Sequence, residues 1–309
     1  MMHFFKSLWL TALVASAAFA QSGSSAVFRA DSRLVVLHAT VVDGNGELVT
    51  NLGEKAFRTY EDNVEQSVKI FRREDMPVSM GIIVDNSASM KEKRQRVETA
   101  AMALVKASNP EDEVFIVNFN DEVFRDVDFT SDLQKLEAGL AHIDCRGGTA
   151  MRDAIYQSIK YMKEKARRDK KVLVVITDGN DNMSEASLEK TIGAAEQRGV
   201  LIYSIGLLNE ESARDIREAH QALDASTKAT GGEAYYPKSA DEVGNIALKI
   251  ARDIRSQYTI AYTPSNPALD GGYRRIRVTV HGPRHPVVRT RTGYYATADL
   301  ARPDLMPRP

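Results

Sequence analysis

The chain has 309 residues, of which 43% are hydrophobic and 27% are charged, and its formal net charge is −1. This composition is ordinary for a globular protein and leaves room for one large or two modest domains. A net charge this close to zero excludes a global electrostatic attraction to nucleic acid, so we expect no nucleic-acid partner. The single cysteine, Cys145, excludes an intramolecular disulfide, leaving either a small buried side chain or a thiol that pairs between chains.

The first twenty residues have the features of a secretory signal peptide. Lys6 supplies a positive charge, and the uncharged run 7–20 that follows is shorter than the ~18 residues of a membrane-spanning helix. Ala18-Phe19-Ala20 matches the small-x-small cleavage pattern. We therefore predict export to the periplasm or outside the cell, with no transmembrane segment after cleavage. An uncleaved membrane anchor is the alternative interpretation.

Residues 21–76 are predicted to open a β domain, because they contain β-branched runs and no helical periodicity. The expected strands cover residues 32–42, 57–60 and 66–72, with turns at 43–46 and 61–63. Pro77 marks the boundary with the next part of the chain.

Strands and helices alternate in residues 77–256, which predicts an α/β domain with a doubly wound, mostly parallel sheet and helices on both faces. The expected strands are 80–84, 114–119, 123–129, 171–178, 200–205 and 234–236. The expected helices are 97–107, 131–143, 150–168, 187–198, 211–230 and 240–256. We expect Ser131 to cap its helix, and 123–129 to pair as an edge hairpin with the strand before it.

Residues 257–297 return to a strand-only pattern, and residues 298–309 are predicted to be a disordered tail. In 274–280, Ile276, Val278 and Val280 alternate with polar side chains, as in a strand with one buried face. Two or three strands are marginally stable alone. We therefore expect both ends of the chain to form one small β-sandwich in which the α/β domain is inserted.

Oxygen-bearing side chains follow the predicted central strands. Asp85, Ser87 and Ser89 lie on alternate residues after one strand, and Asp178 ends another. Thr149 follows a glycine pair just before a helix. Ligands of parallel α/β sheets bind outside the carboxyl ends of the strands, so we expect these five side chains to converge. Hard oxygen ligands of this kind suit a small hard cation such as Mg²⁺.

The order D-x-S-x-S, G-G-T and T-D-G resembles the metal-ion-dependent adhesion site of von Willebrand factor type A domains, over roughly residues 77–254. The resemblance implies that Ser87, Ser89 and Thr149 touch the metal, whereas Asp85 and Asp178 act partly through water. It implies Mg²⁺, or Mn²⁺ or Ca²⁺ in its place, with an open position for an Asp or Glu carboxylate of a protein partner. The side chains expected to rim this position are Asn86, Arg146, Asn180 and Asp181.

The closing segment R-T-G-Y-Y, residues 291–295, resembles that of exported bacterial proteins with a related type A domain. We predict that the protein is not an enzyme but an exported binding or scaffold module. The chain contains no G-x-S-x-G, H-E-x-x-H or phosphate-loop motif, and the Asp85 loop lacks the second acid of aspartyl phosphatases. Four alternatives remain: loops that are only turns, a metal site without a partner, a structural envelope protein that binds through its sandwich, and a Mg²⁺-dependent hydrolase.

Overall fold

The structure is a computed structural model that describes residues 34–297, except residues 74, 142–144, 180 and 209–211. The predicted signal peptide, 1–20, and the predicted tail, 298–309, lie outside the described residues. Within the described part, every helix is too short or too polar to cross a membrane. The domain boundaries drawn from the sequence remain predictions.

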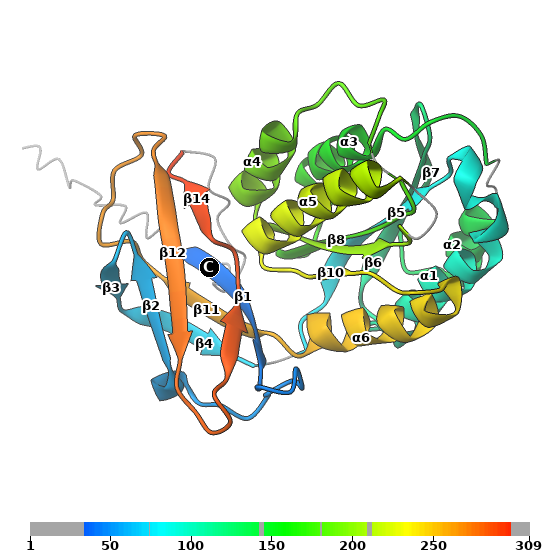
Figure 1. The fold of residues 1–309 in the computed structure, drawn as a ribbon. Helices are drawn as coiled ribbons and strands as arrows, with labels where there is room; N and C mark the ends of the chain where they lie inside the picture. Colours follow the sequence, from blue (N-terminus) through cyan, green and yellow to red (C-terminus); the bar gives the residue numbers. More distant parts are fainter. Residues whose placement is uncertain (1–33, 74, 142–144, 180, 209–211, 298–309) are drawn as a thin grey trace, which may run out of the picture. The chain divides into compact units, whose positions relative to one another are not determined.

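A six-stranded sheet with the order β10-β9-β8-β5-β6-β7 forms the centre of the α/β part (Figure 1). Its strands are β5 (Val78–Asp85), β6 (Glu113–Phe119), β7 (Val123–Thr130), β8 (Lys170–Thr177), β9 (Val200–Gly206) and β10 (Ala234–Tyr235). All neighbours pair in parallel except β7, which runs antiparallel to β6. The predicted mostly parallel sheet is confirmed, and so is its edge hairpin.

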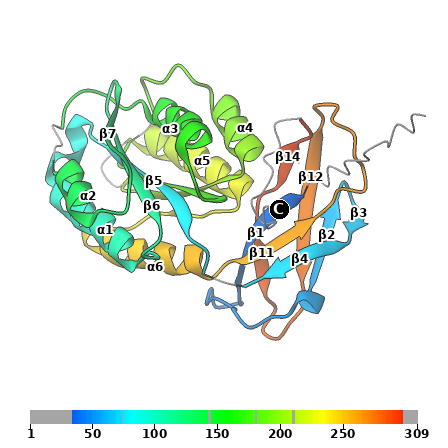
Figure 2. The ribbon, with the colours of Figure 1, turned by 180° about the vertical axis from the view of Figure 1, so that it is seen from behind.

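Helices cover both faces of this sheet, as Figures 1 and 2 show from opposite sides. On one face lie α1 (Arg94–Ala107), α2 (Leu133–Leu140) and α6 (Val243–Arg255). On the other face lie α3 (Met151–Lys165), α4 (Leu188–Arg198) and α5 (Ala213–Thr230). The strand β5 is buried along its whole length because it is covered on both sides.

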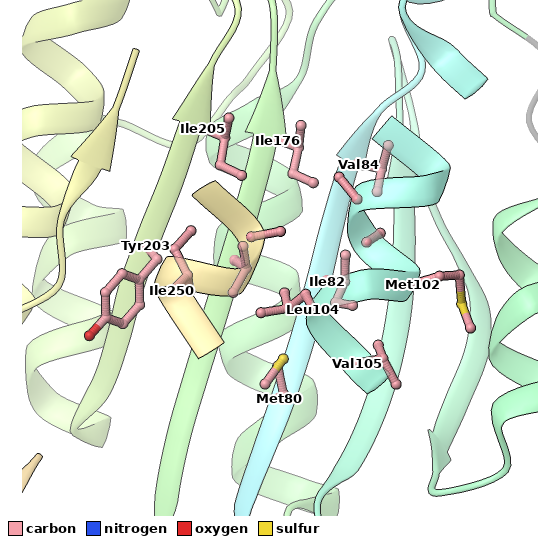
Figure 3. Close-up of a cluster of buried hydrophobic side chains, with 14 of the residues drawn as sticks. Met80, Ile82, Val84, Met102, Leu104, Val105, Ile176, Tyr203, Ile205 and Ile250 are labelled. Carbon is pink, nitrogen blue, oxygen red and sulfur yellow. The ribbon is translucent and has the colours of Figure 1, made fainter. Parts of the chain in front are cut away.

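The alternation of side chains along β5 divides the interior into two hydrophobic cores. Met80, Ile82 and Val84 belong to the core that contains α1 and α6, and Figure 3 shows them on the same side as Leu104 and Ile250. The side chains of the opposite face form the second core, beneath α3 and α5. The sheet is therefore held rigidly at its middle strand.

The helix ends follow from local capping chemistry, with one correction to the predictions. Asp132, and not Ser131, caps α2, because its carboxylate accepts hydrogen bonds from the main-chain nitrogens of residues 134 and 135. Gly199 and Gly231 end α4 and α5 in the left-handed conformation, with φ of 62° and 91°. A short 3₁₀ helix, η2 (Ala88–Glu92), precedes α1 and was not predicted.

The predicted β-sandwich is confirmed, with strands from both ends of the chain in each sheet. One sheet has the order β13-β1-β11-β4, from Val287–Arg289, Val35–Val42, Tyr258–Tyr262 and Val68–Arg72. The other has the order β14-β12-β2-β3, from Gly293–Tyr295, Tyr273–Val280, Phe57–Glu61 and Val64–Gln66. Their apolar side chains share one buried cluster.

The strand predicted over residues 66–72 begins two residues later, as β4, and the short strand β3 before it was not predicted. Gln66 is the last residue of β3, and β3 and β4 belong to different sheets. The chain crosses between the sheets next to Gln66, whose side-chain amide accepts a hydrogen bond from Ser265 N and donates one to Ser265 Oγ. The hydrophobic pattern does not reveal this crossing because β3 has only three residues, too few to show a clear alternation.

Gly81 lies in the middle of β5, where the second core leaves no room for a side chain. A Cβ atom at this position would lie 2.4 Å from Phe115 Cζ and 2.5 Å from Leu173 Cδ2. We expect Gly81→Ala to lower the free energy of unfolding by about 1–3 kcal/mol, the usual cost of overpacking. Urea denaturation followed by circular dichroism measures the change.

Gly53→Ala is the matched control for this substitution, because a Cβ at Gly53 meets no atom within 4 Å and its φ is −86°. We expect it to change the free energy of unfolding by less than about 0.5 kcal/mol. Equal denaturation midpoints for the Gly81 and Gly53 variants would contradict the packing described here.

Candidate metal centre

The carboxyl ends of β5 and β8 are adjacent at the point where the strand order reverses. From β5 the chain continues to β6 on one side, whereas β8 lies on the other side. The two strands pair in parallel with Val84 opposite Ile176, which places Asp85 next to Thr177. Asp178 follows directly after Thr177. This is the position at which doubly wound sheets bind ligands.

Asp85 ends β5 and begins the loop that follows, and it is only 1% exposed. Its Oδ1 accepts a hydrogen bond of 2.8 Å from Ser87 N, and its Oδ2 accepts one of 2.6 Å from Thr177 Oγ1. Burial raises the pKa of Asp85 to about 6, against these hydrogen bonds, which lower it. The carboxylate is therefore held in one orientation by both strands' ends.

Two serine hydroxyls connect this loop to the end of β8. Ser87 Oγ and Ser89 Oγ lie 3.1 Å apart, and Ser89 Oγ donates a hydrogen bond of 2.8 Å to Asp178 Oδ1. A hydroxyl that donates its hydrogen still has lone pairs available for a cation. Four of the five predicted site residues thus form one hydrogen-bonded chain: Asp85, Ser87, Ser89 and Asp178.

The loop that contains Thr149, the fifth predicted residue, is joined to the Asp85 loop by main-chain hydrogen bonds. Arg146 N donates a hydrogen bond of 3.0 Å to Asn86 O, and Ala88 N donates one of 3.3 Å to Gly147 O. These two bonds join the loops. Thr149 N donates to Asn182 Oδ1 at 2.9 Å, and Thr149 is 5% exposed.

Both glycines before Thr149 are required by close contacts. Gly147 has a φ of 73°, and a Cβ there would lie 2.4 Å from Asp121 Oδ2. A Cβ at Gly148 would lie 2.8 Å from Asn182 Oδ1, and Gly148 N donates a hydrogen bond to Asp121 Oδ1. Asp121 belongs to the turn between β6 and β7, so a fourth segment supports the site.

The predicted rim is only partly correct. Asp181 does not lie on it, because its carboxylate accepts hydrogen bonds from Arg152 N at the start of α3 and from Ser184 Oγ. Asn86 is 6% exposed rather than on the surface, and its Oδ1 has no hydrogen-bond partner among the described residues. Arg146 is exposed, and the predicted Asn180 lies outside the described residues. Met183, which was not predicted, is 50% exposed beside Gly148.

Sequence reasoning missed two contacts inside the site. The hydroxyl of Thr177 reaches Asp85 from the neighbouring strand, which could have been found by pairing the two predicted strands. Lys93 Nζ donates to Asp178 Oδ2 at 2.8 Å, and its side chain is only 10% exposed. Lys93 was hidden in the charged run 91–94, which is typical of a solvated surface.

The chemistry of this donor set fits a hard divalent cation. Three hydroxyls and two carboxylates supply oxygen only, the ligand type that Mg²⁺ prefers. The buried Asn86 Oδ1, which lacks a hydrogen-bond partner in the described structure, adds another oxygen in the same loop. Among the described residues, no three histidine, cysteine or acidic side chains gather to hold an ion.

The Thr177 hydroxyl gives a direct test of how Asp85 is held. Thr177→Val removes the donor but keeps the volume of the buried side chain. We expect the free energy of unfolding to fall by about 1.5–3 kcal/mol, the range for hydrogen bonds to charged groups. Thr177→Ser keeps the donor, and its free energy of unfolding should fall by about 1 kcal/mol because a methyl group is lost. Urea denaturation compares them, and a valine variant as stable as wild type would contradict a stabilising role for this bond.

Residues 80–180 match the family model of the von Willebrand factor type A domain. No curated protein matches the chain. The chain is similar to the solved structure of a von Willebrand factor type A protein from Catenulispora acidiphila, with 12% identity and a TM-score of 0.52. That match covers 89% of this chain and 77% of the other, and at this identity it shows a common fold.

Other solved structures are similar at lower TM-scores. One is an aerotolerance-related membrane protein from Bacteroides fragilis, with 19% identity, coverage of 57% of this chain and 98% of the other, and a TM-score of 0.48. Another is proximal thread matrix protein 1 from the mussel byssus with a zinc-occupied MIDAS motif, with 16% identity, coverage of 63% and 50%, and a TM-score of 0.49. Residues 80–180 of this chain thus match the von Willebrand factor type A family model, and the fold around them is shared with the Catenulispora acidiphila protein.

Proposed function

We propose that this protein is an exported module that binds a partner protein through a divalent cation held at the carboxyl ends of β5 and β8. The observation that carries the proposal is the hydrogen-bonded chain from Asp85 through Ser87 and Ser89 to Asp178. Turns that only cap helices do not need hydroxyls and carboxylates of two separate loops to bond to one another.

The proposed roles follow from the contacts of each side chain. Ser87, Ser89 and Thr149 would hold the cation with their hydroxyl oxygens. Asp85 and Asp178, both 1% exposed, orient the serines and supply negative charge. The bound Mg²⁺, Mn²⁺ or Ca²⁺ would supply an electrophilic position for an oxygen ligand from outside. Because the hydroxyls are neutral, the cation keeps much of its charge for that ligand.

The ligand from outside is proposed to be an Asp or Glu carboxylate of a protein partner. A carboxylate is the anionic oxygen donor that proteins offer most readily to a hard cation. The exposed Met183 and Arg146 stand beside the site, so an apolar contact and a positive charge would flank the incoming carboxylate. Such a surface favours an acidic side chain with an apolar neighbour.

Export is proposed from the signal features of residues 1–20, and a binding role rather than catalysis is proposed from the family match. The serine hydroxyls of the site are oriented toward each other and toward Asp178. In this arrangement the hydroxyls keep lone pairs that can bind a cation, which is the ligand role we propose for them.

Calorimetric titration of the purified protein with Mg²⁺ and Mn²⁺, in the presence of acetate, tests the cation site. We expect one-site binding that Asp85→Ala and Thr149→Ala each weaken by at least about 10–100-fold, because each removes a group that holds or orients the ion. Thr149→Ala should keep the native circular dichroism spectrum, since the hydrogen bonds of Thr149 to residues 182 and 183 use its main-chain N–H and carbonyl, which alanine retains.

Thr99→Ala is the matched control, because Thr99 is exposed on α1 and its hydroxyl donates a hydrogen bond to Gln95 O of the same helix. We expect it to bind the cation like the wild type. Failure of the wild type to bind either ion, with and without acetate, would overturn the proposed function. Equal loss of binding in the Thr99 control would show a non-specific effect.

A further inference from the structure

A buried ion pair lies inside the proposed cation site. Lys93 Nζ is 2.8 Å from Asp178 Oδ2, and the side chains of Lys93 and Asp178 are 10% and 0% exposed. The other oxygen of the same carboxylate, Oδ1, accepts the hydrogen bond from Ser89. Asp178 is therefore shared between a proposed cation ligand and a lysine ammonium from the same chain.

The 3₁₀ helix η2 turns this lysine inward. Residues three apart lie above one another in a 3₁₀ helix, and Ser87, Met90 and Lys93 occupy one such row. All three are buried, whereas Lys91 and the other residues between them are exposed. Main-chain hydrogen bonds fix Lys93 on both sides, from its own N–H to Met90 O and from Val97 N to its carbonyl. The lysine is thus part of the site's framework.

The charge balance of the site changes with each ligand. Asp85 and Asp178 carry two negative charges, and Lys93 carries one positive charge. With a divalent cation the sum is +1, and a partner's carboxylate brings it to zero. Without Lys93 the cation alone would already be neutralised, and the partner's carboxylate would leave a negative charge. Net charge is costly in a buried site, so Lys93 disfavours the cation alone and favours the cation with a carboxylate.

We propose that Lys93 makes cation binding conditional on the partner's carboxylate, so that the site holds its ion firmly only when a partner is engaged. This inference rests on the proposed function, because it assumes that the cation binds between Asp85 and Asp178. It adds a residue outside the predicted ligand set that sets the coupling between metal and partner. The wild-type protein should therefore bind Mn²⁺ weakly in chloride and more tightly in acetate.

The test is calorimetric titration with Mn²⁺ in sodium chloride and in sodium acetate at equal ionic strength. We expect acetate to raise the Mn²⁺ affinity of the wild type. Lys93→Met should bind Mn²⁺ at least about tenfold more tightly than the wild type in chloride, because one nearby positive charge is gone. The Mn²⁺ affinity of Lys93→Met should rise little in acetate. Lys93→Arg keeps the positive charge, so acetate should still raise its Mn²⁺ affinity. Lys91→Met changes an exposed residue of the same segment and should bind Mn²⁺ like the wild type.

Thermal unfolding shows whether each variant is folded and how stable it is. Removing Lys93 leaves the buried Asp178 carboxylate without its ammonium partner, so the metal-free Lys93→Met protein should have a lower Tm than the wild type. Its Tm should rise more on addition of Mn²⁺ than that of the wild type. The double variant Lys93→Met with Asp178→Asn removes both charges and should recover the metal-free Tm.

The outcomes separate the two proposals. If no protein binds Mn²⁺ in either salt, the proposed function fails. If the wild type binds but Lys93→Met binds with the same affinity in both salts as the wild type, only the role of Lys93 is overturned. If Lys93→Met gains affinity equally in chloride and acetate, the lysine merely competes with the ion, and the conditional coupling is wrong.

Discussion

The parallel pairing of β5 with β8 is the constraint on which the rest of the site depends. Its register sets Asp85 beside Thr177, and Asp178 one residue farther along. The bond from Thr177 Oγ1 to Asp85 Oδ2 then fixes a buried carboxylate at the edge of the sheet. A slip by one residue would turn every side chain of β5 to the opposite face, and the two hydrophobic cores prevent it. Core packing therefore determines the geometry of a polar site.

Main-chain groups take part in most of the hydrogen bonds that position the loops at this edge of the sheet. Hydrogen bonds to Asn86 O and Gly147 O join the two loops, and Asn182 holds Thr149 through its N–H. Side-chain hydroxyls are left for ligation, while polar groups farther out support the loops. A site that is ordered before its ligand arrives loses less conformational entropy on binding. Here the supporting bonds come from four segments, which include the turn that contains Asp121.

The sequence predicted what periodicity and motif spacing encode, and missed what depends on pairing in space. Alternating apolar runs predicted the mostly parallel sheet and the two-ended sandwich, both confirmed. Four of the five predicted site residues are joined by hydrogen bonds, and the loop of Thr149 is bonded to the Asp85 loop through its main chain, while the role of all five as metal ligands stays a prediction. The crossing at Gln66 was missed because β3 has only three residues and shows no clear alternation, whereas β4 was predicted with its start two residues early. Lys93 was missed because its inward direction depends on a 3₁₀ helix with a period of three, which a short charged run does not signal.

In the proposed cation site, net charge as well as geometry would set the strength of binding. The hydrogen bonds of the sheet ends and loops hold the candidate oxygens in place in this structure. What differs is the net charge enclosed, and the Lys93–Asp178 pair shifts that sum by one unit. A buried ion pair is a poor source of stability in general, because desolvation offsets the attraction between its charges. The value that we propose for it in this position is to select which ligands complete a neutral site.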